Sequence, residues 1–177
     1  MRATRRVFLG LAVQATAGVA CSVAAAQAAA SVTPDYSIEI AETSWEIAPK
    51  RVLRTAAYNG IVPGKLLRVK EGRPVAVEIV NRLDRPEIVH WHGQWVPSDV
   101  DGAMEAGTPV IPAGGRVLVG FTPKPSGLHW YHTHMAAGRD FRKGLYSGQF
   151  GVLYVEPRED RGAYDREEFL ALHDWEP

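Results

Sequence analysis

From residue 36 onward, short apolar stretches alternate with turn residues along the chain. The apolar stretches are rich in Val, Ile, Trp and Tyr, whose branched or aromatic side chains favour strands. Clusters such as Glu71-Gly72 and residues 112–115 (PAGG) separate them and predict tight turns. Short strands are predicted over residues 36–40, 51–58, 65–70, 74–81, 87–92, 116–122, 128–134, 149–155 and 169–173. Many short strands joined by turns are typical of an all-β protein with a β-sandwich fold.

Helical turns are predicted in one segment, residues 136–146, which contains glycines and several charged residues. No internal repeat or low-complexity tract follows residue 28. The roughly 150 residues beyond that point are the usual size of one domain and can bury a self-sufficient core.

The first 28 residues have the features of an export signal. Residues 4–10 (TRRVFLG) resemble the twin-arginine signal, and an Ala- and Gly-rich apolar stretch leads to Ala26-Gln27-Ala28, a small-x-small cleavage site. An uncleaved membrane anchor is the alternative, but Gln14 and the many small residues make the stretch weakly apolar for a spanning helix. The protein is therefore expected in the periplasm or another extracytoplasmic compartment of a bacterium.

The charge of the chain changes when this signal is removed. The whole chain has 20 basic and 20 acidic side chains, and the signal holds Arg2, Arg5, Arg6 and no acid. The remainder has 17 basic against 20 acidic side chains, a net charge of −3. No basic face for nucleic acid is implied, and no membrane contact is expected after signal cleavage.

Two histidine pairs carry the clearest chemical signal. His90 and His92 flank one tryptophan in H-W-H-G, and His132 and His134 flank one threonine in H-T-H. In a strand, residues two apart face the same side, so each pair directs two imidazoles one way. Chance alone predicts about 0.1 such triplets in a chain of this length, which disfavours unrelated core or surface histidines. Four neutral imidazoles from two neighbouring strands suit copper, zinc, iron or nickel.

The sequence around both pairs closely resembles the N-terminal cupredoxin domain of the multicopper oxidases, the family of laccases, bilirubin oxidases and bacterial cuprous oxidases. The segments that carry the resemblance are 59–64 (NGIVPG), 80–83 (VNRL), 90–93 (HWHG) and 125–134 (PSGLHWYHTH). The resemblance extends from about Tyr36 to the C-terminus. It implies a cupredoxin-like Greek key β-sandwich, and we assign residues 29–160 to this plastocyanin-like domain.

The resemblance also implies roles for individual residues. In this family the two histidine pairs supply half the ligands of a trinuclear copper cluster that reduces dioxygen to water. His90 would be the type 2 copper ligand, and His92, His132 and His134 would serve the type 3 pair. Asp101 occupies the place of a carboxylate that feeds protons to the oxygen intermediates. An Asp before a Gly is also a common turn residue, so both interpretations of Asp101 stay open.

Other residues near the pairs are expected outside the ligand set. His129 is three residues before His132 and should face away from it in a regular strand. His173 lies in a segment that resembles the first strand of the next domain of the family. Trp91 and Trp130 are expected to pack around the site.

Cysteine usage excludes a further copper site. Cys21 is the single cysteine and lies within the signal, so the mature chain can form neither a disulfide nor a blue copper centre, which needs a thiolate. Lipidation of Cys21 is a weaker alternative, because Gly18 stands where an aliphatic residue is usual. Residues 161–177 are interpreted as a linker and the first strand of a missing second domain, in a fragment or in a short form that pairs with another chain.

These observations predict a copper-binding N-terminal part of a multicopper oxidase. In the complete enzyme the partners are dioxygen and a reducing substrate that this chain does not identify. The chain alone is expected to be inactive, because the electron-entry copper and half the cluster ligands are missing from it. The alternative from another class is a non-catalytic periplasmic module that binds or delivers copper.

Overall fold

The computed structural model describes residues 33–136, 138–159 and 162–175. The chain divides into two units, residues 1–32 and 33–177, and the described residues all belong to the second. The predicted export signal lies outside the described residues. Within the described part, no helix has the length and apolar character needed to cross a membrane.

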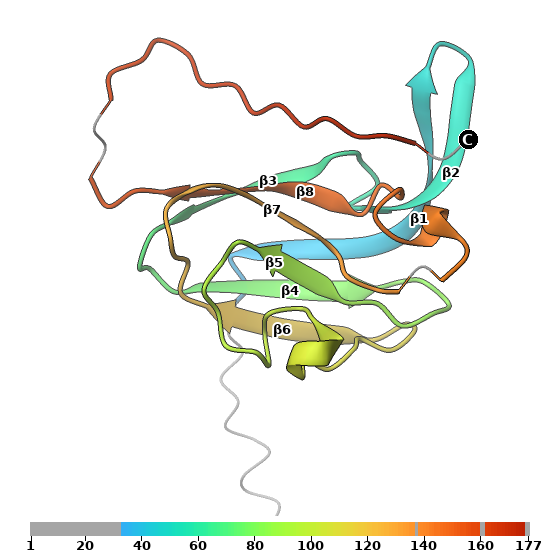
Figure 1. The fold of residues 1–177 in the computed structure, drawn as a ribbon, viewed down its shortest axis with the longest axis horizontal. Helices are drawn as coiled ribbons and strands as arrows, with labels where there is room; N and C mark the ends of the chain where they lie inside the picture. Colours follow the sequence, from blue (N-terminus) through green and yellow to red (C-terminus); the bar gives the residue numbers. More distant parts are fainter. Residues whose placement is uncertain (1–32, 137, 160–161, 176–177) are drawn as a thin grey trace, which may run out of the picture. The chain divides into compact units, whose positions relative to one another are not determined.

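Eight strands form two four-stranded sheets (Figure 1). Sheet A has the order β2-β1-β4-β6, with β1 at Tyr36–Ala48, β2 at Arg51–Tyr58, β4 at Val75–Asn81 and β6 at Arg116–Phe121. Sheet B has the order β3-β8-β7-β5, with β3 at Gly64–Lys70, β8 at Phe150–Glu156, β7 at Gly127–Thr133 and β5 at Val89–His92. Neighbours are antiparallel except for the parallel pairs β1–β4 and β3–β8. The predicted all-β sandwich is confirmed.

The core lies between the two sheets and is built by alternation along the strands. In β4, Val75, Val77 and Ile79 are buried, because every second residue of a strand faces the same side. Sheet B contributes Trp91 from β5 and Tyr131 from β7, both fully buried. Burial of each large apolar side chain stabilises the fold by about 1.5–3 kcal/mol. Since Trp91 and Tyr131 face inward, their strand neighbours on either side face outward from sheet B.

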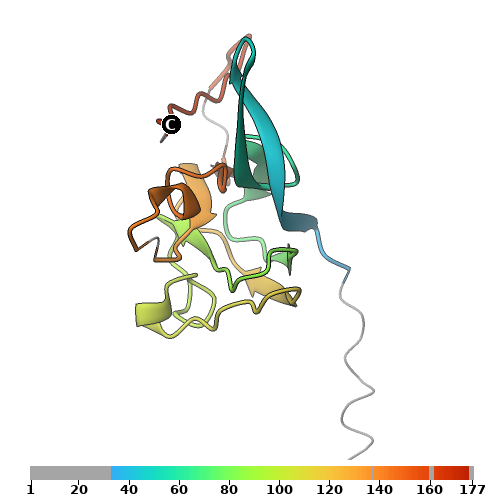
Figure 2. The same cartoon turned by 90° about the vertical axis from the view of Figure 1, so that its right-hand side faces the viewer.

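The predicted strands between residues 36 and 155 are all present, with ends shifted by a few residues. The largest difference is β1, which continues to Ala48 and forms a long hairpin with β2. The tip of this hairpin extends past the sheets in Figures 1 and 2. Of the short 3-10 helices, η2 at Phe141–Lys143 falls in the segment predicted to contain helical turns, and η1 at Met104–Ala106 was not predicted.

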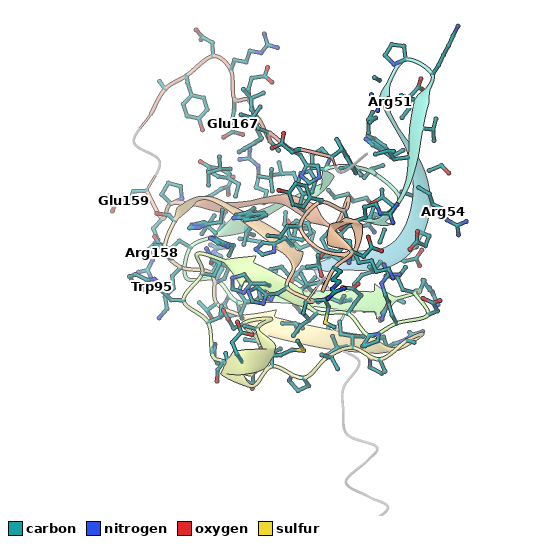
Figure 3. The ribbon with its side chains drawn as sticks, turned by 45° about the vertical axis from the view of Figure 1, so that its right-hand side comes forward. Arg51, Arg54, Trp95, Arg158, Glu159 and Glu167 are labelled. Atoms are coloured by element: carbon teal, nitrogen blue, oxygen red, sulfur yellow. The ribbon has the colours of Figure 1, made fainter. Side chains whose placement is uncertain are left out.

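The predicted strand at residues 169–173 is wrong, because residues 162–175 form no strand in the structure. They run as an extended segment along β8, where the Phe169 ring contacts Tyr154 and the His173 ring stacks on Phe150 at 4.4 Å. Glu167, labelled on this segment in Figure 3, forms an ion pair with Arg68 of β3. The strand was predicted as part of a further domain. A strand needs a partner for its backbone hydrogen bonds, and β8, along which this segment lies, is already paired with β3 and β7.

Candidate metal centre

The four histidines of the two pairs come together on the outward face of sheet B. Strands β5 and β7 are antiparallel neighbours, and their register places His90 opposite His132 and His92 opposite Trp130. His134 follows directly after the end of β7. The convergence predicted from strand parity is therefore present, and it follows from the pairing of two H-x-H triplets in this register.

The imidazoles form one cluster. Ring centroids are 5.3 Å apart for His90 and His132, 5.5 Å for His90 and His92, and 5.4 Å for His92 and His132. One nitrogen from each of these three rings lies within 4.8 Å of the other two. The closest approach joins His92 Nδ1 and His132 Nε2, at 3.3 Å. His134 lies at the rim, with its ring 5.1 Å from that of His90 and its side chain 36% exposed.

Backbone carbonyls set the tautomers of two of these rings. His90 Nδ1 lies 2.7 Å from the carbonyl oxygen of Asp101, and His132 Nδ1 lies 2.7 Å from the carbonyl oxygen of Thr133. A carbonyl oxygen can only accept, so each Nδ1 must carry the proton and donate it. The lone pair of each neutral ring is then on Nε2, the nitrogen that can bind a metal ion, and in the metal-free protein His132 Nε2 accepts a hydrogen bond from His92 Nδ1.

Desolvation and the neighbouring imidazoles favour the neutral forms of His132 and His92. Burial lowers the pKa of His132 to about 4, and the neighbouring His90, His92 and His134 lower it further against the opposing hydrogen bond to Thr133. Burial also lowers the pKa of His92, with smaller contributions from His90, His129 and His134. A crowded set of imidazoles resists protonation, because each added proton repels the next. The lowered pKa values of His92 and His132 therefore favour neutral rings, whose lone pairs can bind a metal ion.

The two tryptophans have different positions. The Trp130 indole lies on the same face as the histidines and stacks on the His132 ring, with centroids 3.9 Å apart and planes 27° apart. It also contacts the His92 ring at 5.0 Å. Trp91 lies on the opposite face, in the core, 4.8 Å from the Phe121 ring. Trp130 therefore restricts the rotation of the His132 ring, whereas Trp91 holds β5 in place by packing in the core between the sheets.

The remaining histidines lie apart from the cluster, as predicted. His129 is opposite Leu153 in the register of β7 and β8, on the core side of sheet B, and its Nε2 lies 3.1 Å from the carbonyl oxygen of Pro125. His173 packs against Phe150 and Trp175.

Asp101 lies in a loop that is pressed against β5. Its carbonyl oxygen accepts hydrogen bonds from His90 Nδ1 and from the Trp91 backbone N–H, and its Oδ2 is 3.5 Å from His90 Nδ1. The contact requires Gly102, which has a φ of 83° and whose added Cβ would lie 1.9 Å from the carbonyl oxygen of Val89. Thr108 holds the loop, because its Oγ1 accepts the Gly102 N–H at 2.9 Å.

Sequence reasoning missed Thr108, Glu105 and Glu87. Glu105 Oε1 lies 3.8 Å from His134 Nδ1 at the rim. Glu87 is buried behind the cluster and accepts a hydrogen bond from the Thr133 hydroxyl at 2.9 Å. A signal for Glu87 was present: it shares strand parity with the core residues Val89 and Trp91, where a carboxylate is unexpected. Thr108 had no signal, since its role depends on loop geometry.

Comparison with known proteins identifies the family. A family model described as multicopper oxidase matches residues 39–160, which is more than half of the chain. The chain belongs to the multicopper oxidase family. The match contains both histidine pairs and the Asp101 loop, so the geometry described above is that of a multicopper oxidase domain.

Curated relatives give the same family. The chain is 36% identical over 143 residues to copper resistance protein A of Pseudomonas syringae pv. tomato, which covers 80% of this chain and 22% of the relative. It is 31% identical over 191 residues to multicopper oxidase MmcO of Mycobacterium tuberculosis, covering 98% of this chain and 36% of the relative. The chain thus spans between about a fifth and about a third of the length of these curated relatives.

Solved structures support the cupredoxin fold. The multicopper oxidase of Pseudomonas thermotolerans matches with a TM-score of 0.65 and 31% identity, over 72% of this chain and 30% of that chain. The blue copper oxidase of Nitrosomonas europaea matches with a TM-score of 0.63 and 31% identity, over 71% of this chain and 39% of that chain.

The donor set of this multicopper oxidase domain fits copper. Imidazole nitrogen is a favoured copper ligand, and the cluster offers four such rings, two of them with Nε2 lone pairs fixed by their hydrogen bonds. Two nitrogens at about 2.0 Å from one ion, with a tetrahedral angle between them, lie about 3.3 Å apart. His92 Nδ1 and His132 Nε2 are 3.3 Å apart. These two nitrogens already have the spacing for a shared ion, and binding would require His92 Nδ1 to give up the proton that it donates to His132 Nε2 in the metal-free protein.

Proposed function

We propose that this chain is the copper-binding N-terminal part of a multicopper oxidase and that His90, His92, His132 and His134 hold the copper. The observation that carries the proposal is the convergence of four imidazoles from β5 and β7 on one face. When bound, copper supplies the one-electron redox chemistry for the reduction of dioxygen to water. The other half of the cluster ligands would come from further domains or a second chain, in keeping with the much greater length of the relatives.

Within this proposal the histidines divide by position. His92, His132 and His134 would serve the type 3 pair, and the 3.3 Å separation of His92 Nδ1 and His132 Nε2 supports a shared ion. His90 would be the type 2 ligand. Its Nδ1 is tied to the Asp101 loop, so its Nε2 alone remains for the metal.

Asp101 would move protons at the cluster. Its Oδ2 lies 3.5 Å from His90 Nδ1, and a quarter of its side chain is exposed, so the carboxylate reaches both solvent and the site. A carboxyl group in this position could exchange protons with solvent at Oδ2 and pass them on to the site. The expected effect of Asp101→Asn in the complete enzyme is a fall in oxygen uptake of about 100-fold with copper content unchanged. Equal loss of copper and activity would instead indicate a structural turn role.

The proposed setting is outside the cytoplasm. Residues 1–28 would direct export by the twin-arginine route, and the mature chain would work with dioxygen and a reducing substrate in the periplasm or a comparable compartment. The Arg5→Lys/Arg6→Lys variant should remain in the cytoplasm, since that route recognises paired guanidinium groups. Normal export of this variant would contradict the route.

A second candidate function is a copper-binding or copper-delivery module without catalysis. The accessibility of His92 and of the rim residue His134 favours it, because ions exchange readily at an open site. Two of the relatives are also named copper resistance protein A.

Oxygen uptake separates the two candidates. The copper-loaded chain alone should bind copper but sustain no uptake with phenols or cuprous ion, and addition of the complementary domains should produce uptake that His132→Ala abolishes. Copper binding with no uptake in the completed assembly would favour the delivery module. Sustained, copper-dependent uptake by the isolated chain would contradict the half-site proposal.

A further inference from the structure

Glu87 is the one buried acidic side chain among the described residues, with 1% of its surface exposed. Burial of a carboxylate is unfavourable unless hydrogen bonds or a close cation compensate it. The nearest cation, Arg85, keeps its Nε 3.6 Å away, beyond a normal hydrogen bond. Burial accordingly raises the pKa of Glu87, and Thr133, Gln149 and Arg85 oppose that shift. The unfavourable burial of the Glu87 carboxylate indicates that this side chain has a specific role at this position.

The backbone of Glu87 is held by two hydrogen bonds to Ile111, a residue that lies outside the strands of sheet B. Its N–H donates to the carbonyl oxygen of Ile111 at 2.9 Å, and the Ile111 N–H donates back at 2.8 Å. Asn81 Nδ2 holds the same Ile111 carbonyl at 3.1 Å. The carboxylate therefore projects from a rigid anchor, two residues before β5 begins.

The carboxylate contacts Thr133, which lies between His132 and His134. The Thr133 Oγ1 donates to Glu87 Oε2 at 2.9 Å and accepts the Met135 N–H at 3.2 Å, which turns the chain just after His134. The Thr133 N–H donates to the carbonyl oxygen of Gln149 at 3.0 Å. The Thr133 carbonyl oxygen accepts the His132 Nδ1 proton. Every polar group of Thr133 is thus used to fix this part of the chain.

We propose that Glu87 is a positioning residue that acts through Thr133 to fix the ring of His132 and the direction of the chain at His134. Because the Thr133 hydroxyl donates its hydrogen bond to Glu87 Oε2, the lone pairs of Thr133 Oγ1 face the Met135 N–H. Loss of the acceptor frees the hydroxyl to rotate and loosens the turn. The significance for copper rests on the function proposed above, whereas the positioning itself is a property of the metal-free protein.

The chain offers a matched control in Thr55. This threonine is also buried, and its Oγ1 accepts a backbone N–H, that of Gly148, at 2.9 Å. It donates to the carbonyl oxygen of Ala56 and has no hydrogen bond to the histidine cluster. Thr55→Val and Thr133→Val remove the same atom from similar surroundings, so they separate positioning of the histidines from a general loss of stability.

The first measurement uses copper-free protein and the imidazole ¹H and ¹⁵N signals of His132 and His134. Thr133→Val and Glu87→Leu should shift and broaden both sets of signals, Thr55→Val should leave them in place, and Thr133→Ser should restore them. Glu87→Gln, which keeps an acceptor oxygen, should have an intermediate effect and carries the test if Glu87→Leu does not fold. Unchanged His132 and His134 signals in Thr133→Val, or equal changes in Thr55→Val, would overturn the proposal.

The second measurement is Cu(II) affinity by competition with a chelator, together with the electron paramagnetic resonance spectrum. Thr133→Val should weaken binding by about ten-fold and broaden the spectrum, as for other residues that orient metal-binding histidines. Thr55→Val should bind as the parent does. If the parent binds no copper, the proposed function fails, while the signals of the copper-free protein still decide the role of Glu87.

Discussion

His90 donates its Nδ1 proton to the backbone carbonyl oxygen of Asp101, at 2.7 Å, so a loop outside the sheet sets the orientation of a candidate ligand. The backbone makes this contact, and the Asp101 carboxylate lies close by, with its Oδ2 3.5 Å from the same His90 nitrogen. The loop reaches this position only because Gly102 packs directly on β5.

This relationship predicts a large effect of Gly102→Ala. The new Cβ would overlap the carbonyl oxygen of Val89 and would sit at a positive φ, so the loop must move away from His90. We expect a loss of about 2–4 kcal/mol in unfolding free energy, measured by denaturant titration, and weaker copper binding. Gly107→Ala is the control, since Gly107 also has a positive φ but open space around it, and about 1 kcal/mol is expected there. Equal effects of the two substitutions would contradict the role of the loop contact.

The stability of the copper-free protein should depend on pH through His132. Burial lowers the pKa of His132 from the ordinary histidine value of 6.5 to about 4 in the folded protein, so the unfolded chain binds the proton more readily between these values. The free energy of unfolding is then unaffected by His132 above about pH 6.5, and it falls by roughly 3 kcal/mol as the pH drops toward 4. Thermal unfolding across this range should show the slope, and His132→Gln should reduce it. A slope that is the same in His132→Gln would contradict the assignment.

The copper-loaded protein should lack the intense blue colour of thiolate copper. Cys21, the single cysteine, lies in the predicted signal, so imidazole is the expected donor class in the mature chain. The absorption spectrum should show weak bands only, and the Cu(II) resonance should show coupling to imidazole nitrogen. An intense blue band in the cysteine-free chain would mean that the ligand set is different.

Strand periodicity was sufficient to predict a β-sandwich and the shared direction of the two imidazoles in each pair, whereas the cupredoxin assignment came from the family resemblance. Two H-x-H triplets on neighbouring strands face the same side whenever the strands pair in register, and His90 and His132 are direct partners. The outward direction of His92 and the inward direction of Trp91 obey the same rule.

Other features depend on tertiary structure and were not predictable. The segment at residues 169–173 has a strand-like composition, but its structure depends on whether a sheet edge is free, and β8 has none. The role of Thr108 depends on how the loop after Asp101 folds back. The link from Glu87 to Thr133 depends on an anchor at Ile111, which lies far away in sequence.

The most direct test of the central claim is the copper content of a double variant, His92→Ala/His134→Ala. These two histidines are accessible, whereas His132 is buried, so their removal should leave the fold intact. The control is His129→Ala, which removes an imidazole from β7 on the side of sheet B opposite to the cluster. Metal analysis after copper loading and desalting should show that the double variant loses most of its copper while His129→Ala keeps it. Unchanged copper in the double variant would contradict the assignment of this cluster as the metal site.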